Sequence, residues 1–330
     1  MAFDGRQLNA FLAVVTHGSL GRAAQALHLT QPALSRTIRR LELQIGAPLF
    51  DRQTKGMSLT AIGEALLPHA RLLQHQADIA DEEIQALRGL AKGTIRVGAI
   101  GSAASGVLPL ALARTLECWP NLRAYVVEGV SDRLSHALAN HEIDLALDVV
   151  RPTDDDDPEV CAIADCQWED RSSIVAASAH PLRRRPGLKL ADTLAEKWAV
   201  PPRGTEPFDH LQQVLRAHGL PLPNVVIETR SITMLKSLIV HAGFLCWMAE
   251  PICEAERAAG SIDALPLPEL VAPRRLTVFR RRHGMLPAPA AKLVEQLRRV
   301  RPHLSAAPAP ELVRGTRHLA ALAHAGVEAG

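Results

Sequence analysis

The sequence predicts an α/β chain with an N-terminal winged helix-turn-helix domain, a long linker helix and a C-terminal α/β domain of two subdomains. Three observations predict this order. Apolar residues recur at helical spacing in residues 7–45, a helical stretch follows over about 61–90, and short apolar strands then alternate with helices. We expect the winged helix-turn-helix domain at 1–60, a linker helix at 61–92, an α/β domain at 93–302 and a peripheral tail at 303–330.

Three helices are expected in the N-terminal domain, over residues 7–16, 19–28 and 31–45. Ser19 can cap the second helix, and Thr30 can cap the third. Two amphipathic helices joined by a tight turn have the form of a helix-turn-helix, which places the third helix against DNA.

A wing and a long helix are expected next. Residues 49–60 suit a small β-hairpin, and Thr60 then caps the helix over about 61–90. This helix carries an imperfect apolar seam, formed by Ile62, Leu66, His69, Leu73, Gln76, Ile79 and Leu87. A helix between domains cannot bury such a seam alone, so we expect dimerisation through it. Packing of the helix on its own domain is the alternative.

Two sets of strands and helices form the predicted α/β domain. The strands expected in the first set are 94–100, 122–128 and 144–149. Those in the second set are 171–177, 197–200, 224–228 and 244–249. The acidic segment 151–166 separates the sets, and a last strand and helix return to the first. We therefore expect one subdomain at about 93–165 and 267–302, and another at about 166–266.

Charge and composition limit the class of protein. The net charge is only +2, yet residues 1–60 hold seven basic and three acidic side chains, which suits a polyanionic partner. The N-terminus lacks a signal-peptide pattern, and no apolar run is long enough for a transmembrane helix. Five cysteines without zinc-ligand spacing indicate free thiols. We expect a cytoplasmic protein that does not contact a membrane.

The stretches SLGRAAQALHLTQPALSRTIRRLELQIGAPLFDR and GMSLTAIGEALL resemble the LysR-type transcriptional regulator family. The resemblance covers about residues 6–90 at the level of motifs and continues more loosely through residue 302. It implies a periplasmic-binding-protein-like effector domain, a small-molecule effector, and dimers or tetramers that bind promoter DNA and act with RNA polymerase. A looser likeness, in DRQTKGMSLT and VPPRGT, is to regulators of sugar and aromatic-acid uptake or catabolism.

The third helix supplies the expected base contacts. Gln31 can pair with adenine, Pro32 and Ala33 can touch a thymine methyl group, and Ser35 and Arg36 lie on the exposed side. Arg36 would read guanine or bind a phosphate. Contacts to the DNA backbone are expected from Thr30, Arg39, Arg40 and Arg52. A solvated polar face is the alternative interpretation of these side chains.

The effector is expected where strands end and helices begin, between the two subdomains. The hydroxyl groups in GAIGSAASG would form an anion cradle with the next helix, although a capped turn explains the same residues. Across the cleft, the arginine of PPRGT would clamp a carboxylate, unless it is simply solvated like most loop arginines. The candidate effector-binding residues are Ser102, Ser105, Arg203, Gly204, Thr205 and Ser231. These groups suggest an organic anion, such as a carboxylate.

Two other classes of protein share the α/β pattern. A solute-binding protein would need an export signal and would not carry a helix-turn-helix. A doubly wound enzyme would need a catalytic constellation, but the 14 histidines include no HExxH motif and the glycine-rich stretch lacks GxGxxG. We therefore expect no catalytic residue, cofactor or metal ion.

Overall fold

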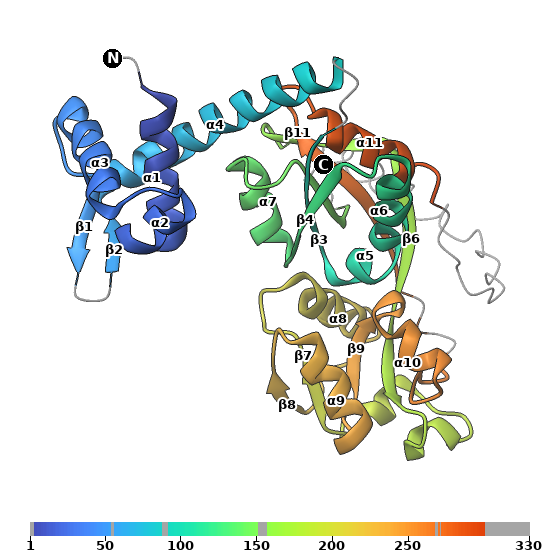
Figure 1. Ribbon diagram of the computed structural model, residues 1–330. Coiled ribbons are helices and arrows are strands. Elements are labelled where there is room, and N and C mark those ends of the chain that lie inside the picture. The colour runs from blue at the N-terminus through green and yellow to red at the C-terminus, as the bar shows by residue number, and fades with distance from the viewer. Residues whose placement is uncertain are drawn as a thin grey trace, which may run out of the picture.

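The computed structural model describes residues 3–53, 56–87, 92–150, 157–267, 270 and 272–300, without the side chains at 52–53, 56, 82–83 and 86–87. Figure 1 shows a small N-terminal domain joined by the long helix α4 (Ala61–Leu87) to a larger α/β domain. The expected tail at 303–330 lies outside the described residues, as do residues 54–55 of the expected wing. No helix in the described ranges has the length and apolarity needed to cross a lipid bilayer.

Three helices form the N-terminal domain as expected: α1 (Gly5–His17), α2 (Leu20–Ala26) and α3 (Gln31–Ile45). Ser19 caps α2, because its hydroxyl accepts a hydrogen bond from the Arg22 N–H at 3.2 Å.

The predicted side-chain cap at Thr30 is wrong. Thr30 has an extended backbone before α3, but its hydroxyl makes no capping hydrogen bond. Pro32 stands at the second position of the helix and has no N–H to donate. The Ala33 N–H donates instead to the backbone carbonyl of Thr30, at 3.0 Å.

A β-hairpin and an apolar core complete this domain. The hairpin pairs β1 (Phe50–Gln53) with β2 (Gly56–Leu59) in antiparallel register. The rings of Phe11 and Phe50 lie 5.3 Å apart between their centroids. The main buried side chains of the core are Leu8, Phe11, Val14, Leu34, Ile38, Leu41, Leu49 and Phe50. Burial of these side chains fixes which face of α3 remains outside.

Helix α4 has two apolar faces rather than the one predicted seam. Leu66 and Ala70 are buried in the N-terminal core, and Ile79 is buried farther along the helix. Two other members of the predicted seam, Ile62 and Leu73, are 44% and 46% exposed. The seam therefore divides between a face that packs within the chain and a face that remains exposed.

A mixed sheet of seven strands within the described residues organises the α/β domain. These strands are β3 (Gly93–Ala99), β4 (Leu122–Glu128), β5 (Leu145–Val149), β6 (Val160–Ala177), β9 (Cys246–Ala249), β10 (Ile262–Ala264) and β11 (Ala272–Arg281). β3 runs parallel to β4 and β5, whereas β11 runs antiparallel to β5 and β6. β9 and β10 pair with the far end of β6.

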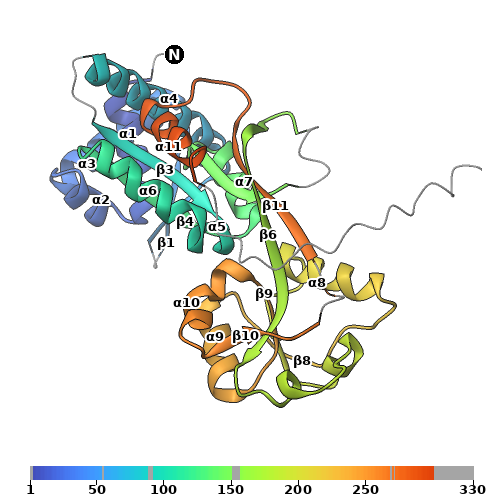
Figure 2. The ribbon, with the colours of Figure 1, turned by 90° about the vertical axis from the view of Figure 1, so that its right-hand side faces the viewer.

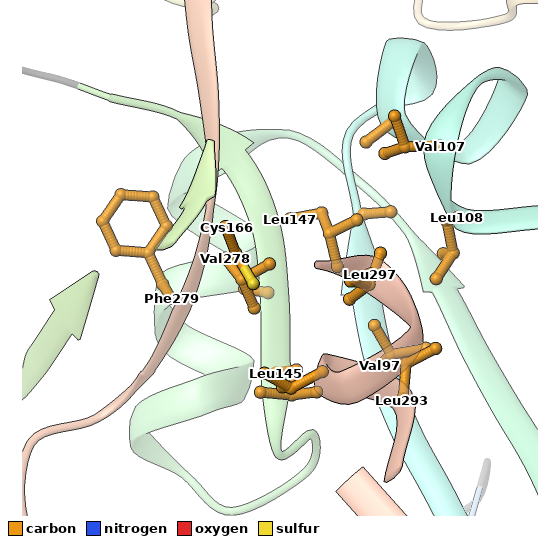
Figure 3. Close-up of a cluster of buried hydrophobic side chains, with 14 of the residues drawn as sticks. Val97, Val107, Leu108, Leu145, Leu147, Cys166, Val278, Phe279, Leu293 and Leu297 are labelled. Atoms are coloured by element: carbon orange, nitrogen blue, oxygen red, sulfur yellow. The ribbon is translucent and has the colours of Figure 1, made fainter. Parts of the chain in front are cut away.

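The first subdomain consists of β3 to β5, the first half of β6, the second half of β11, and the helices around them. These helices are α5 (Gly101–Ser105), α6 (Val107–Cys118), α7 (Ser131–Ala139) and α11 (Ala288–Leu297). Figure 3 shows Leu293 and Leu297 of α11 beside Val97 and Leu145 of the strands. α11 therefore packs against the strands of the first subdomain.

The second subdomain consists of the chain from the second half of β6 to β10. It contains β7 (Trp198–Val200), β8 (Val225–Glu228), α8 (Glu206–Ala217), α9 (Ile232–Ala242) and α10 (Glu254–Ala258). Trp198 is fully buried in the core of this subdomain, and its indole N–H donates to the Thr193 carbonyl at 2.8 Å.

Strands β6 and β11 connect the two subdomains, as Figure 2 shows. The sequence predicted a strand only from residue 171, but β6 begins at Val160. Its first half alternates buried side chains such as Cys166 and Trp168 with exposed polar ones such as Asp165 and Glu169, so it has no continuous apolar run. The segment 151–166 is thus not only a separator, because its last residues belong to the sheet.

Candidate nucleic-acid interface and ligand cavity

One face of α3 is polar and exposed because the other is fixed in the core. Leu34, Ile38 and Leu41 are at most 4% exposed and recur at helical spacing, which turns the intervening side chains outward. The exposed candidates on this side are Thr30, Gln31, Pro32, Arg36, Arg39 and Arg40, while Ala33 and Ser35 are half-buried. The structure therefore places eight of the nine predicted DNA-contacting residues on α3 and on the residue that precedes it, Thr30. The side chain of Arg52 lies outside the described part of the chain.

The arginines of this face have no acidic neighbour paired with them in the described part of the chain. No ion pair among the described residues involves Arg36, Arg39 or Arg40. Three guanidinium groups within five residues of an exposed helix create a concentrated positive potential. This arrangement suits the phosphates of a DNA backbone.

A cavity of about 400 Å³ lies between the subdomains. Its walls come from the loop before α5, the start of α8, the start of α9 and the strands β6, β9 and β11. Most of the walls are apolar, and the principal apolar side chains are Ile100, Ile232, Leu235, Trp247, Met248 and Ile252. Such a cavity fits a small molecule with an apolar body and a few polar groups.

The structure places the predicted effector-binding residues unequally. Ser102 and Thr205 line this cavity from opposite subdomains, and both are almost fully buried. Gly204 lines a second, more polar cavity of about 810 Å³ next to it, and Thr205 lines both. These three residues are therefore brought together at the cleft.

The other three candidates lie elsewhere. Ser105 is exposed at the last residue of α5. Ser231 is exposed, and its hydroxyl caps α9 by accepting from the Met234 N–H at 3.2 Å. The Arg203 side chain is 67% exposed, with its Nε 3.4 Å from Glu228 Oε1. In this structure, none of the three contributes to the wall of either cavity.

A buried arginine in the cleft escaped the sequence reasoning. Arg274 of β11 is 7% exposed, and its guanidinium lies 2.6 Å from Asp170 Oδ2 and 3.0 Å from Glu206 Oε2. It also donates to the Ser102 hydroxyl at 3.4 Å. Burial alone would lower the pKa of Arg274, but the carboxylates of Glu206 and Asp170 outweigh burial and hold it above its usual value. Arg274 is therefore a permanent cation in the cavity wall.

The alternation of inward and outward positions along β11 and β6 could have identified Arg274 and Asp170. Arg274 lies two and four residues before the buried Leu276 and Val278, on the inward side of β11. Asp170 likewise shares the inward side of β6 with Trp168 and Ser172. A charged residue at an inward position requires a partner of opposite charge, so the two positions predict each other.

A third polar cluster joins α4 to the first subdomain. His75 of α4 is 5% exposed, and its Nε2 lies 2.9 Å from a guanidinium nitrogen of Arg281 and 3.3 Å from Asp144 Oδ1. Arg281 also donates to the carbonyls of Leu138 and Ile143, at 3.0 and 2.6 Å. Burial, followed by the charge of Arg281, lowers the pKa of His75 to about 3. The imidazole is therefore neutral and accepts the hydrogen bond from Arg281.

Two further ion pairs hold α4 on the same subdomain. Arg71 lies 2.6 Å from Glu142, and Asp78 lies 3.2 Å from Arg96. Together with His75 they occupy about two turns of α4. The helix that carries the N-terminal domain is thus attached to the first subdomain by a buried contact flanked by two ion pairs nearer the surface.

Comparison with known proteins agrees with both halves of this architecture. Residues 5–64 match the model of the bacterial regulatory helix-turn-helix protein, lysR family, and residues 88–302 match the LysR substrate binding domain. The SDS degradation transcriptional activation protein of Pseudomonas sp. (strain ATCC 19151) is 32% identical over 297 residues, which are 89% of this chain and 95% of that protein. The uncharacterized regulator YdcI of Escherichia coli (strain K12) is 29% identical over 265 residues, 80% of this chain and 84% of that protein.

Solved structures share the whole arrangement of domains. Full-length CbnR in complex with its target DNA superposes with a TM-score of 0.66 and 23% sequence identity, covering 90% of this chain and 99% of that one. The family comprises transcriptional regulators and not enzymes. With a helix-turn-helix, a long linker helix and a substrate-binding domain in this order, the chain belongs to the LysR family of DNA-binding transcriptional regulators.

Proposed function

We propose that this regulator reads a promoter through α3 and changes its DNA binding when an organic acid or a sugar-related metabolite occupies the cavity between the subdomains. The observation that carries the proposal is the polar face of α3, where Arg36, Arg39 and Arg40 have no acidic partner among the described residues. A helix of this kind fits the major groove of B-DNA.

Sequence reading is assigned to the first half of α3. Gln31 and Arg36 are exposed and carry groups that pair with adenine and guanine in bidentate fashion. Arg39, Arg40 and the side chain of Thr30 are assigned to the DNA backbone, where they add affinity without sequence information. The wing residue Arg52 belongs to the same proposal.

The cavity is the proposed effector site because it combines apolar walls with polar groups from both subdomains. Ser102 belongs to the first subdomain and Thr205 to the second, so one ligand can contact both. A ligand that bridges them favours one relative position of the subdomains. It regulates DNA binding only if its affinity differs between the two arrangements.

We also propose that the chain forms a dimer or tetramer through α4. Four large apolar side chains of this helix are between 37% and 55% exposed, and they are Ile62, Leu72, Leu73 and Ile84. Exposed apolar residues along one helix are typical of an interface between helices. A Leu73→Lys variant is expected to lower the molecular mass measured by light scattering, and an unchanged mass would contradict the proposed interface.

A mobility-shift titration with the intergenic DNA upstream of the chain's own coding region tests the proposed promoter binding. We expect a complex that survives an excess of unrelated DNA. Binding that the unrelated DNA removes completely would overturn the proposal. Thermal-shift measurements with small carboxylic acids and sugars test the class of effector. If neither class raises the melting temperature, the proposed effector class is contradicted.

A further inference from the structure

In the cleft, the guanidinium group of Arg274 lies between two carboxylates. Arg274 binds Asp170 through one terminal nitrogen, at 2.6 Å, and both oxygens of Glu206 through the other, at 3.0 and 3.3 Å. Asp170 supplies one negative charge and Glu206 a second, so the three side chains carry a surplus negative charge if both acids are ionised. Burying two carboxylates beside one guanidinium has a large desolvation cost. One of the two carboxylates can therefore be replaced by another anion more easily than a carboxylate in a balanced ion pair.

The two carboxylates differ in their access to solvent and to the cavity. The side chain of Asp170 is 1% exposed and does not line the cavity, whereas that of Glu206 is 22% exposed and lines both cavities. Glu206 also stands at the first position of α8. A side chain at the end of a helix can turn toward solvent without any change in the strands of the sheet. Asp170 is thus a fixed partner of Arg274, and Glu206 is an exchangeable one.

Two residues that line the cavity carry a buried donor without an acceptor among the described residues. The Nε of Arg274 and the indole Nε1 of Trp247 have no hydrogen-bond partner among the described residues, although both side chains are at least nine-tenths buried. Both residues line the cavity. A buried donor without an acceptor destabilises the structure. A ligand that brings acceptor oxygens to this wall would remove that cost and bind more tightly for this reason.

We propose that the effector carries a carboxylate that replaces Glu206 on Arg274, with its apolar body against Ile232 and Trp247. This inference rests on the proposed function, because it takes the cavity as the effector site. The exchange keeps two carboxylates on the guanidinium and releases Glu206 to solvent. Glu206 is then a built-in competitor, which raises the effector concentration needed for binding and links ligand entry to the start of α8.

The test removes the competitor and offers a simple carboxylate in its place. In the full-length chain, Glu206→Ala opens space beside Arg274 that acetate can fill. Thermal unfolding is followed with increasing acetate, with acetamide as the neutral probe of the same shape and with chloride holding the ionic strength constant. We expect acetate to stabilise Glu206→Ala with an apparent Kd at least about tenfold lower than for the wild-type chain, which corresponds to about 1.4 kcal/mol. Acetamide is expected to have no such effect.

Glu228→Ala is the matched control. It removes a glutamate that also pairs with an arginine of the second subdomain, Arg203, but lines neither cavity. Its response to acetate is expected to equal that of the wild-type chain. Should Glu206→Ala fail to fold, Glu206→Gln keeps the size of the side chain and removes its charge, and the same acetate titration is then read on that variant.

Three results would overturn the exchange. These are an acetate effect no larger in the Glu206 variant than in the wild type, an equal effect of acetamide, and stabilisation of the wild type by ethylammonium rather than acetate. The last result would mean that Glu206 itself binds a cationic ligand. Each of these outcomes leaves the mobility-shift result untouched, so failure of the exchange and failure of the proposed DNA-binding function are distinguishable.

Discussion

Arg274 and Arg281 lie on the same strand, β11, seven residues apart, with the first in the wall of the cavity and the second against His75 of α4. Seven residues of extended strand span roughly 23 Å. The strand is also held along its length by β5 and β6. β11 therefore connects the wall of the cavity to the helix that carries the N-terminal domain.

Removal of the imidazole at this junction should release α4 from the effector domain. His75→Ala removes one of the two side-chain acceptors of this terminal nitrogen of Arg281, which keeps Asp144 Oδ1 at 3.1 Å, and opens a small void, at a cost of about 2–3 kcal/mol. We expect faster hydrogen exchange in the α4 turns around residue 75, measured by mass spectrometry. His69→Ala is the control, because His69 is an exposed histidine of the same helix. Equal exchange in the two variants would show that the buried contact does not hold the helix.

Acid should destabilise the protein through the buried His75 and the half-buried His141 and His210. Burial is the largest cause that lowers the pKa of His75 to about 3, of His141 to about 4 and of His210 to about 4. The unfolded chain takes up these protons near pH 6.5, whereas the folded chain does not. The free energy of unfolding is therefore highest above about pH 6.5 and falls as the pH decreases toward 4. Each such proton contributes a slope of about 1.4 kcal/mol per pH unit. Urea unfolding at several pH values measures this slope.

The His75→Ala variant checks the origin of that slope, because it removes one of the three protons. Its stability should depend less steeply on pH between 6.5 and 4 than that of the wild type. A free energy of unfolding that is constant over this interval in the wild type would contradict the assignment of neutral buried imidazoles.

Two substitutions in α3 should separate DNA recognition from folding. Arg36→Ala and Gln31→Ala change exposed side chains, so the melting temperature is expected to stay within the error of the measurement. Each should cost about 1–3 kcal/mol of discrimination between the operator and unrelated DNA. Footprinting on both DNAs measures the difference. Arg114→Ala, the same loss of charge on the exposed surface of α6, should bind as the wild type does.

The backbone contacts predict a different signature. Arg39→Ala and Arg40→Ala should weaken binding to all DNA sequences alike and reduce the slope of log K against log salt by about 1 each. Fluorescence anisotropy at several salt concentrations gives this slope. A variant that alters sequence preference while leaving the slope unchanged would move its arginine from the backbone to the bases.

The sequence predicted the DNA-binding domain more fully than the cleft, and the reason is physical. In α3, the spacing of Leu34, Ile38 and Leu41 alone determines which side chains face outward. The strands and helices of the α/β domain follow equally from local periodicity. The main element missed was the first half of β6, where an alternation of polar and apolar residues hides the strand.

Residues of the cleft could be predicted only in part, because the cavity is assembled from segments far apart in the chain. Ser102 and Thr205 were found because they follow strands and precede helices. Arg274 and Asp170 were missed, since they lie within strands and 104 residues separate the two. Ser231 caps α9, a role that the local sequence predicts. Its hydroxyl accepts a hydrogen bond from within the chain, and the residue does not line the cavity.

Footprinting of the wild-type chain on the intergenic DNA upstream of its own coding region tests the central claim most directly. The account predicts a protected segment that is bound at least about a thousandfold more tightly than unrelated DNA at physiological salt, and that Arg36→Ala loses. Equal affinity of the wild-type chain for the upstream segment and for unrelated DNA would contradict promoter recognition by α3.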